Sequence, residues 1–199
     1  MFKPAVSGRA YVRTMTESTK TNPSTTASST EKKSVRGVTG QHTTDGVPHG
    51  STSLTPFLAV PEAARAVEFY RDVFGARVVD VVEAGGQVVH ADLDLGRGHL
   101  QVGEPSPQYG LLPPSEGDSV CYSLGLYCSD VDATVERAVA AGATIREPLA
   151  TFVSGDRFAS IRDPFGVRWT VMSRVEDLSE AESTARVARW AAEQSSQSS

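Results

Sequence analysis

One helix pattern occurs twice in this sequence of 199 residues. The first copy, residues 60–76, carries alanine, valine and aromatic side chains at helical spacing and ends at Gly75. The second copy, residues 128–143, begins with Asp130, a favourable N-cap, and ends at Gly142. Because the two glycines are 67 positions apart, the repeat is longer than a solenoid unit and is typical of two modules of one small domain.

Strand signals surround both helices. β-Branched runs and alternating stretches, separated by glycine and proline turns, indicate one strand before each helix and three after it. These strands are predicted at residues 54–60, 76–83, 87–95, 99–102, 120–128, 144–153, 157–162 and 167–172. Each module is therefore predicted to be βαβββ, which makes the chain an α+β fold of two such modules with a further helix at the C-terminus.

Composition divides the chain into three parts. Residues 1–52 are predicted to be a disordered Ser/Thr-rich tail, because stretches such as 19–30 hold almost no apolar surface to bury. A domain is predicted over residues 53–178, with modules 53–103 and 119–174. Residues 179–199 are predicted to form an amphipathic C-terminal helix with a frayed end.

Charge and cysteine content exclude some classes of protein. The net charge of −5 argues against nucleic-acid binding, and no apolar run approaches the roughly 18 residues of a membrane span. Cys121 and Cys128 occupy one predicted strand at odd spacing, which places their side chains on opposite faces. We expect two free, structurally buried thiols in a reducing, cytoplasmic compartment.

Two local motifs connect the modules to a known family. A helix ending Phe69-Tyr70 … Phe74-Gly75-Ala76, together with Asp163-Pro164-Phe165-Gly166 before the last strand, resembles the vicinal oxygen chelate superfamily of glyoxalases, bleomycin resistance proteins and extradiol dioxygenases. Residues 155–169 are most similar to its PhnB-like glyoxalase branch. The resemblance covers about residues 53–178. It implies two half-barrels around a concave cavity, and a homodimer.

The resemblance also implies one divalent metal ion, held by histidine and glutamate at four positions. In this chain those positions fall on Thr55, Gln101, Ser123 and Thr170. None of these side chains is a preferred ligand of a divalent ion, which takes imidazole, carboxylate or thiolate. We therefore expect no metal at this site, no cofactor, and a metal-independent protein that binds a small molecule in the cavity between the modules.

Seven residues are candidates for lining that cavity, and no catalytic residue is assigned. They are Phe57, Gln101, Tyr122, Ser123, Phe158, Trp169 and Thr170. The aromatic side chains among them could stack on a planar ligand. Packing in the core is the alternative for each aromatic side chain.

The alternative function is a lyase, isomerase or dioxygenase with a displaced metal site around His90. His90, Asp92 and Asp94 share one face of their strand, opposite Val89, Ala91 and Leu93, so two neighbouring side chains could meet one ion. They could equally form the solvated face of a half-buried strand. His99, beside a tight turn, is expected to be exposed. A third possibility is a docking role for the C-terminal helix through Trp190.

Overall fold

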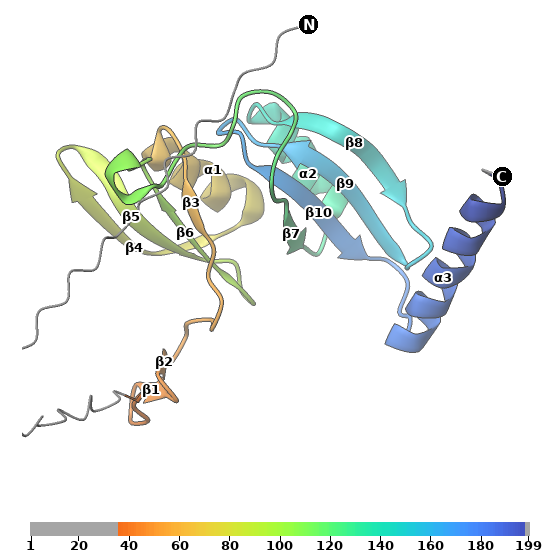
Figure 1. Cartoon of the computed structure of the whole chain (residues 1–199), viewed down its shortest axis with the longest axis horizontal. Coiled ribbons are helices and arrows are strands. Elements are labelled where there is room, and N and C mark those ends of the chain that lie inside the picture. The colour runs from red at the N-terminus through yellow and green to blue at the C-terminus, as the bar shows by residue number, and fades with distance from the viewer. Residues whose placement is uncertain (1–35, 198–199) are drawn as a thin grey trace, which may run out of the picture. The chain divides into compact units, whose positions relative to one another are not determined.

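The computed structural model describes residues 36–197, and the elements from Gly37 onward belong to one compact unit (Figure 1). In chain order the elements are β1 (Thr43–Thr44), β2 (Val47–Pro48), β3 (Phe57–Ala59), α1 (Ala63–Phe74), β4 (Arg77–Ala84), β5 (Gln87–Asp94), β6 (His99–Gly103), a 3₁₀ turn (Pro107–Tyr109), β7 (Leu124–Tyr127), α2 (Val131–Ala140), β8 (Thr144–Thr151), β9 (Asp156–Arg162), β10 (Arg168–Arg174) and α3 (Glu180–Gln197).

The eight strands of the two modules form two separate sheets. The strand order is β3-β6-β5-β4 in the first and β7-β10-β9-β8 in the second. In each sheet the first strand of the module runs parallel to its last strand, and the other pairs are antiparallel. This is the same topology twice. The predicted α+β fold of two βαβββ modules with a C-terminal helix is confirmed.

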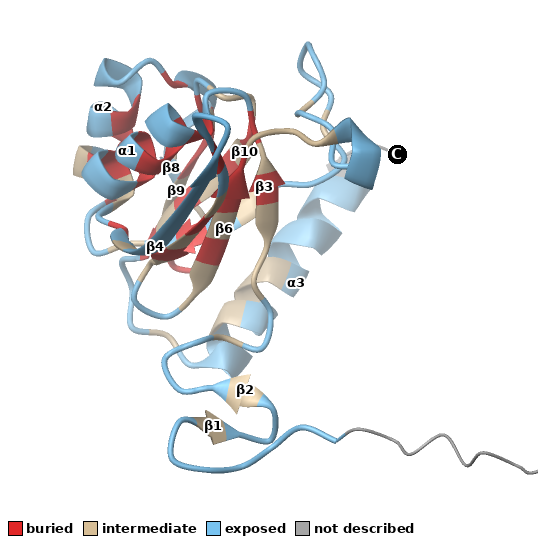
Figure 2. Cartoon of the chain, turned by 90° about the vertical axis from the view of Figure 1, so that its left-hand side faces the viewer, coloured by how far each residue is buried: buried red, intermediate tan, exposed pale blue. Residues whose placement is uncertain are grey.

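Helices α1 and α2 cover one face of the sheets, and Figure 2 shows the buried residues between these two layers. The buried apolar residues form one cluster that includes Leu58 and Leu93 of the first sheet, Val135 of α2, and Ile161 and Trp169 of the second sheet. The two modules therefore share a core. The sheet faces turned away from the helices, called the open faces below, are less buried.

Both repeat helices end as the sequence predicts. Gly75 follows α1 with φ of +72°, a conformation that glycine adopts without steric cost, and its amide donates to the Tyr70 carbonyl group. The Asp130 side chain accepts a 3.0 Å hydrogen bond from the Ala133 amide at the start of α2. The first amide of α1, that of Ala63, instead donates to Glu104 Oε1 at 2.7 Å.

The segment before the first module differs from the expected structureless tail. Within the described part of that tail, β1 and β2 form a two-stranded hairpin. Asp45 and Gly46 at its turn both have positive φ, which is the turn geometry that an Asp-Gly pair favours between antiparallel strands. Residues 1–35, the greater part of the predicted tail, lie outside the described residues.

Strand β7 is shorter than the predicted strand 120–128, and this changes the position of one cysteine. Cys121 precedes the strand and is exposed, so the expectation that it is buried is wrong. Residues 120–123, the first part of the predicted strand, lie outside β7. Cys128 is half-buried, with Sγ 3.8 Å from Ser173 Oγ. Both thiols are free, as predicted.

The C-terminal helix α3 packs on the turn between β8 and β9. The Trp190 ring lies 5.0 Å from the Phe152 ring in an edge-to-face arrangement, and Ser183 Oγ donates to the Ser154 carbonyl group. No residue of α3 belongs to the buried cluster of the domain. Among the helices within residues 36–197, none is long and apolar enough to cross a lipid bilayer.

Candidate functional site between the modules

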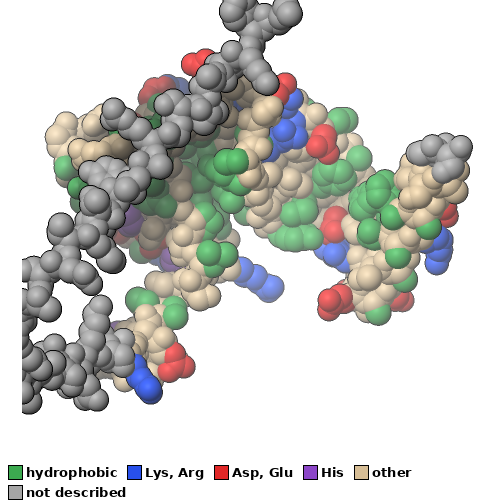
Figure 3. Space-filling view, viewed as in Figure 1, with side chains coloured by type: hydrophobic (Ala, Val, Ile, Leu, Met, Phe, Trp, Pro, Cys, Tyr) green, Lys and Arg blue, Asp and Glu red, His purple; other side chains and the backbone are tan. Residues whose placement is uncertain are grey.

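A cavity of about 810 Å³ lies between the hairpin turn of β5 and β6 in the first module and strand β7 in the second. Small-molecule sites in proteins occupy roughly 300–1,000 Å³ and combine apolar walls with a few polar groups. Figure 3 shows hydrophobic side chains at the centre of the view, where the modules adjoin. The size and position of the cavity make it the candidate site.

Apolar side chains from both modules form most of the wall. They are Pro56, Leu95, Leu100, Leu124, Leu126 and Trp169. Leu100, Leu126 and Trp169 are buried members of the shared core, so this part of the wall is held rigidly. Such a surface suits the apolar body of a ligand, because burying it removes apolar area from water on both sides.

The polar part of the wall contains cationic and neutral groups. It consists of Arg97, His99, Tyr127, Cys128 and Ser129. Among the described residues that line the cavity, there is no aspartate or glutamate. The chain as a whole has 24 acidic and 19 basic residues and a net negative charge. The described residues that line the cavity differ from this average, because their one charged side chain of fixed sign is that of Arg97.

His99 is held in place by Asp92. The His99 Nδ1 atom lies 3.0 Å from Asp92 Oδ1, and the His99 side chain is only 8% exposed. The expectation that His99 is exposed is therefore wrong. The chain reverses direction within the short turn Gly96-Arg97-Gly98. His99 is therefore the first residue of β6, and it pairs with Asp94 of β5 inside the sheet instead of extending into solvent.

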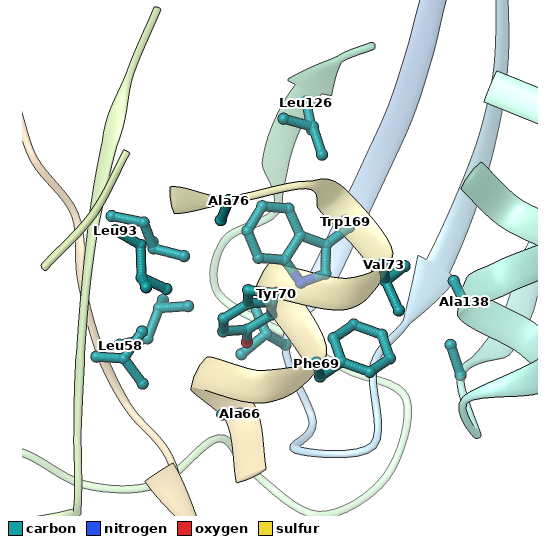
Figure 4. Packing of buried hydrophobic residues seen from close by; sticks show 14 of the residues in the cluster. Leu58, Ala66, Phe69, Tyr70, Val73, Ala76, Leu93, Leu126, Ala138 and Trp169 are labelled. Atoms are coloured by element: carbon teal, nitrogen blue, oxygen red, sulfur yellow. The ribbon is translucent and has the colours of Figure 1, made fainter. Parts of the chain in front are cut away.

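Trp169 lines the cavity from the core, and Asp163 holds its indole ring. Trp169 Nε1 donates to Asp163 Oδ2 at 2.9 Å, and the Tyr70 hydroxyl group donates to the same oxygen atom at 2.7 Å. The Trp169 ring packs against Phe74 of α1, with ring centres 4.8 Å apart. Figure 4 shows Trp169 beside Tyr70 on α1, with Leu126 on the side of β7.

Of the seven predicted lining residues, only Trp169 lines this cavity, and it does so as a core residue. The others lie on the open faces or in the connection between the modules. Phe57 and Gln101 are paired neighbours on the open face of the first sheet. Ser123, Phe158 and Thr170 lie on the same side of the second sheet, where Ser123 Oγ is 3.5 Å from Thr170 Oγ1. Tyr122 is exposed, next to Cys121.

His90, Asp92 and Asp94 share the open face of β5, as the alternation predicts. Val89, predicted on the buried face, is instead 43% exposed, because the pairing of β4 with β5 shifts register between Val82 and Glu83. The backbone amide of Gly96 and then the Arg77 guanidinium hold the pKa of Asp94 below its usual value. The hydrogen bond from the Gly96 amide to Asp94 also stabilises the turn that contains Arg97.

The four positions at which the resemblance implies metal ligands do not suit a divalent ion. Their donors are hydroxyl and amide oxygens, and three of them already take part in hydrogen bonds with neighbours: Thr55 with Thr52, and Ser123 with Thr170. Within residues 36–197, no three histidine, cysteine, aspartate or glutamate side chains lie in an arrangement that could hold a metal ion.

Sequence reasoning did not find most of this cavity. Arg97 belongs to a Gly-x-Gly stretch that indicates a tight turn, and nothing in that pattern distinguishes an arginine at a cavity from one in solvent. Leu95, Leu100 and Leu126 carry the signature of core residues. No short pattern in the sequence marks the turn between β5 and β6 and the strand β7 as neighbours.

Curated relatives share the domain. The uncharacterized protein Mb0911c of Mycobacterium bovis is 32% identical over 136 residues, which cover 63% of this chain and 86% of that protein. The uncharacterized protein Rv0887c of Mycobacterium tuberculosis is 32% identical over 136 residues, covering 63% of this chain and 76% of that protein.

Solved structures share the fold. TioX from Micromonospora sp. ML1 is 32% identical with a TM-score of 0.51, over 62% of this chain and 99% of that chain. Protein PA1353 from Pseudomonas aeruginosa is 24% identical with a TM-score of 0.50, over 62% of this chain and 98% of that chain. The similar structures include a PhnB protein from Bacillus cereus, at 20% identity and a TM-score of 0.49, over 61% of this chain and 99% of that chain.

A family model matches residues 46–171, a span that contains the first βαβββ module, the second module up to the middle of β10, and the residues that line the cavity. The chain belongs to the Glyoxalase/Bleomycin resistance protein/Dioxygenase superfamily.

Proposed function

We propose that this protein binds a small molecule in the cavity between its two modules and does so without a metal ion at the four superfamily ligand positions. The observation that carries the proposal is the cavity of about 810 Å³ with rigid apolar walls and a short polar edge. The hydroxyl and amide groups at Thr55, Gln101, Ser123 and Thr170 support the metal-independent part. The open-face residues that the sequence predicts as ligand contacts do not line this cavity, so the proposal does not depend on them.

A neutral fluorescent probe, N-phenyl-1-naphthylamine, tests the binding site. The probe should bind the full-length protein in a saturable manner, and Leu124→Trp should weaken it because a larger side chain at the partly buried wall fills the cavity. Leu112→Trp is the matched control, since Leu112 is 68% exposed and does not line the cavity. Equal effects of the two variants on probe affinity would overturn the proposed site.

Metal loading distinguishes the proposal from a lyase, isomerase or dioxygenase with a metal near His90. The protein is incubated with nickel, zinc, manganese or iron(II), desalted and analysed for bound metal. We expect no stoichiometric metal. A bound equivalent that is lost in His90→Ala, but kept in the tail variant His49→Ala, would instead support the enzyme.

We also propose that the protein forms a homodimer. The support is the family likeness together with exposed valines at the edge of the first sheet, where β4 pairs with β5 on one side and with no strand of the described chain on the other. These are Val79, Val81 and Val82 of β4 and Val89 of β5. Size-exclusion chromatography with light scattering tests this, and a monomer at micromolar concentration would contradict it.

A cytoplasmic location is the remaining proposal. It is supported by the two free cysteines, which are typical of proteins in reducing compartments. Fractionation of cells that express the full chain would test it.

A further inference from the structure

We propose that the ligand of the cavity is an amphiphilic monoanion, a small molecule with one carboxylate or similar acidic group on an apolar body, and that Arg97 and His99 bind its charged end. This inference rests on the proposed function, because it names the class of molecule that the same cavity takes. It follows from the charges, the fixed polar groups and the apolar wall of the cavity.

Arg97 provides an unneutralised positive charge. It is exposed, lines the cavity, and makes no ion pair or side-chain hydrogen bond with any residue in the range 36–197. The acidic side chains of the adjoining strand are engaged with other groups: Asp94 binds Arg77 at 2.7 Å and the Gly96 amide at 2.7 Å, and Asp92 binds His99. A guanidinium group in this position is free to form a two-pronged contact with an acidic ligand.

His99 provides a second polar group whose direction is fixed. Asp92 accepts the Nδ1 proton, so Nε2 is the ring nitrogen that is left for a ligand, and Nε2 donates to an acidic group when the ring carries both protons. Asp92 itself does not line the cavity. Asp92 is therefore a positioning residue, which acts through His99 rather than by touching the ligand.

The exposed edge of β7 adds backbone donors. Strand β7 pairs only with β10, and the Cys128 amide donates to the Met172 carbonyl group of β10. Since amides alternate sides along a strand, those of Gly125 and Tyr127 point away from β10, and both residues line the cavity. An edge strand with free amides favours an acceptor, and a carboxylate is a strong one.

The apolar wall accounts for the rest of the ligand. Pro56, Leu95 and Leu124 line the cavity and are half-buried, so they present apolar surface beside its polar residues. A ligand that is charged throughout would leave this surface in contact with water, and an entirely apolar ligand would leave Arg97 and His99 without an acceptor. One acidic group on an apolar body satisfies both sides.

A matched pair of probes tests the inference on the full-length protein. 8-Anilinonaphthalene-1-sulfonate carries a sulfonate group, and N-phenyl-1-naphthylamine has the same aromatic body without it. We expect the anionic probe to bind more tightly, and Arg97→Met to weaken it by roughly tenfold while the neutral probe is unaffected. Arg65→Met, which removes the same charge from the exposed surface of α1, should change neither affinity.

The role of Asp92 is tested by the ratio of the two affinities. His99→Leu and Asp92→Asn should both lower the preference for the anionic probe, and a general loss of structure would weaken both probes together. A preference for the anionic probe that survives in both variants would overturn the assignment of His99 and Asp92.

Failure of the inference and failure of the proposed function give different results. If the neutral probe binds and is blocked by Leu124→Trp, but the anionic probe gains nothing from Arg97, the cavity is a binding site and the anion class is wrong. If Leu124→Trp leaves both probes unchanged, the cavity is not the site and both proposals fall.

Discussion

The Tyr70 hydroxyl group donates a 2.7 Å hydrogen bond to Asp163, and this bond joins helix α1 of the first module to the β9–β10 turn of the second. Tyr70 is fully buried and Asp163 is 4% exposed. The Asp163 carboxylate also accepts from Trp169 Nε1 and from the Phe165 and Val167 amides. Asp163 therefore closes its own turn, holds the Trp169 ring and connects the modules.

Removing the Tyr70 hydroxyl group should destabilise the whole domain. In Tyr70→Phe the buried carboxylate loses one of its donors without gaining water, and a hydrogen bond to a charged group contributes about 1.5–3 kcal/mol. We expect a decrease of about that size in the free energy of unfolding, measured by urea titration. Tyr109→Phe, at a site 78% exposed, should have almost no effect. Equal stability of the two variants would contradict the role of this bond.

The same pair predicts a pH dependence in alkaline solution. Burial, and then the negative charge of Asp163, raise the pKa of Tyr70 well above its ordinary value. Above about pH 10 the unfolded tyrosine loses its proton while the folded one keeps it, so stability falls as pH rises through that range. Tyr70→Phe has no ionisable hydroxyl group at this position, so its free energy of unfolding does not fall for this reason. The stability difference between wild type and Tyr70→Phe should shrink from pH 8 to pH 11, and a constant difference would argue against the raised pKa.

Gly103 is required by close packing rather than by its backbone conformation. A Cβ atom there would lie 2.5 Å from the Val89 carbonyl oxygen and 2.9 Å from the Phe57 ring. Because the first of these is backbone of strand β5, Gly103→Ala should cost about 1–3 kcal/mol of stability. Gly98→Ala is the matched control, as nothing lies within 4 Å of its added Cβ. Thermal unfolding of both variants checks this, and a tolerated Gly103→Ala would show that β5 can move.

Removing the Trp190 ring should increase local opening of helix α3 without unfolding the domain. Trp190 is 40% exposed, and its ring contact with Phe152 is one of few links between α3 and the second module. Trp190→Ala should change the free energy of unfolding by less than about 1 kcal/mol, the range for surface positions. Amide hydrogen exchange in α3 should nevertheless become faster, with Arg189→Ala as the control. A cooperative loss of stability would mean that α3 belongs to the folding unit of the domain.

Local sequence patterns predicted the modules well because their causes are local. Gly75 stops α1 through its own positive φ, Asp130 caps α2 through an amide three residues away, and Asp163 accepts from amides within its own turn. Each signal acts over a few residues, so the order of strands and helices, and with it the superfamily, can be read directly. The Asp45-Gly46 turn is a signal of the same kind in the segment that we expected to lack structure.

The candidate site depended on contacts that no short pattern contains. Alternation along β5 shows that His90 and Asp92 share a face. It does not show that Asp92 binds His99, or that Arg97 has no side-chain partner among residues 36–197. A β-bulge reversed the position of Val89 without any proline or glycine to announce it.

The sequence by itself therefore determined two βαβββ modules and their helix ends. Only the tertiary structure decided which strand edges remain free and where the cavity lies. The physical reason is that docking of the modules depends on contacts between distant residues, such as Tyr70 with Asp163 and Phe74 with Trp169, whose partners are selected by packing of the complete core.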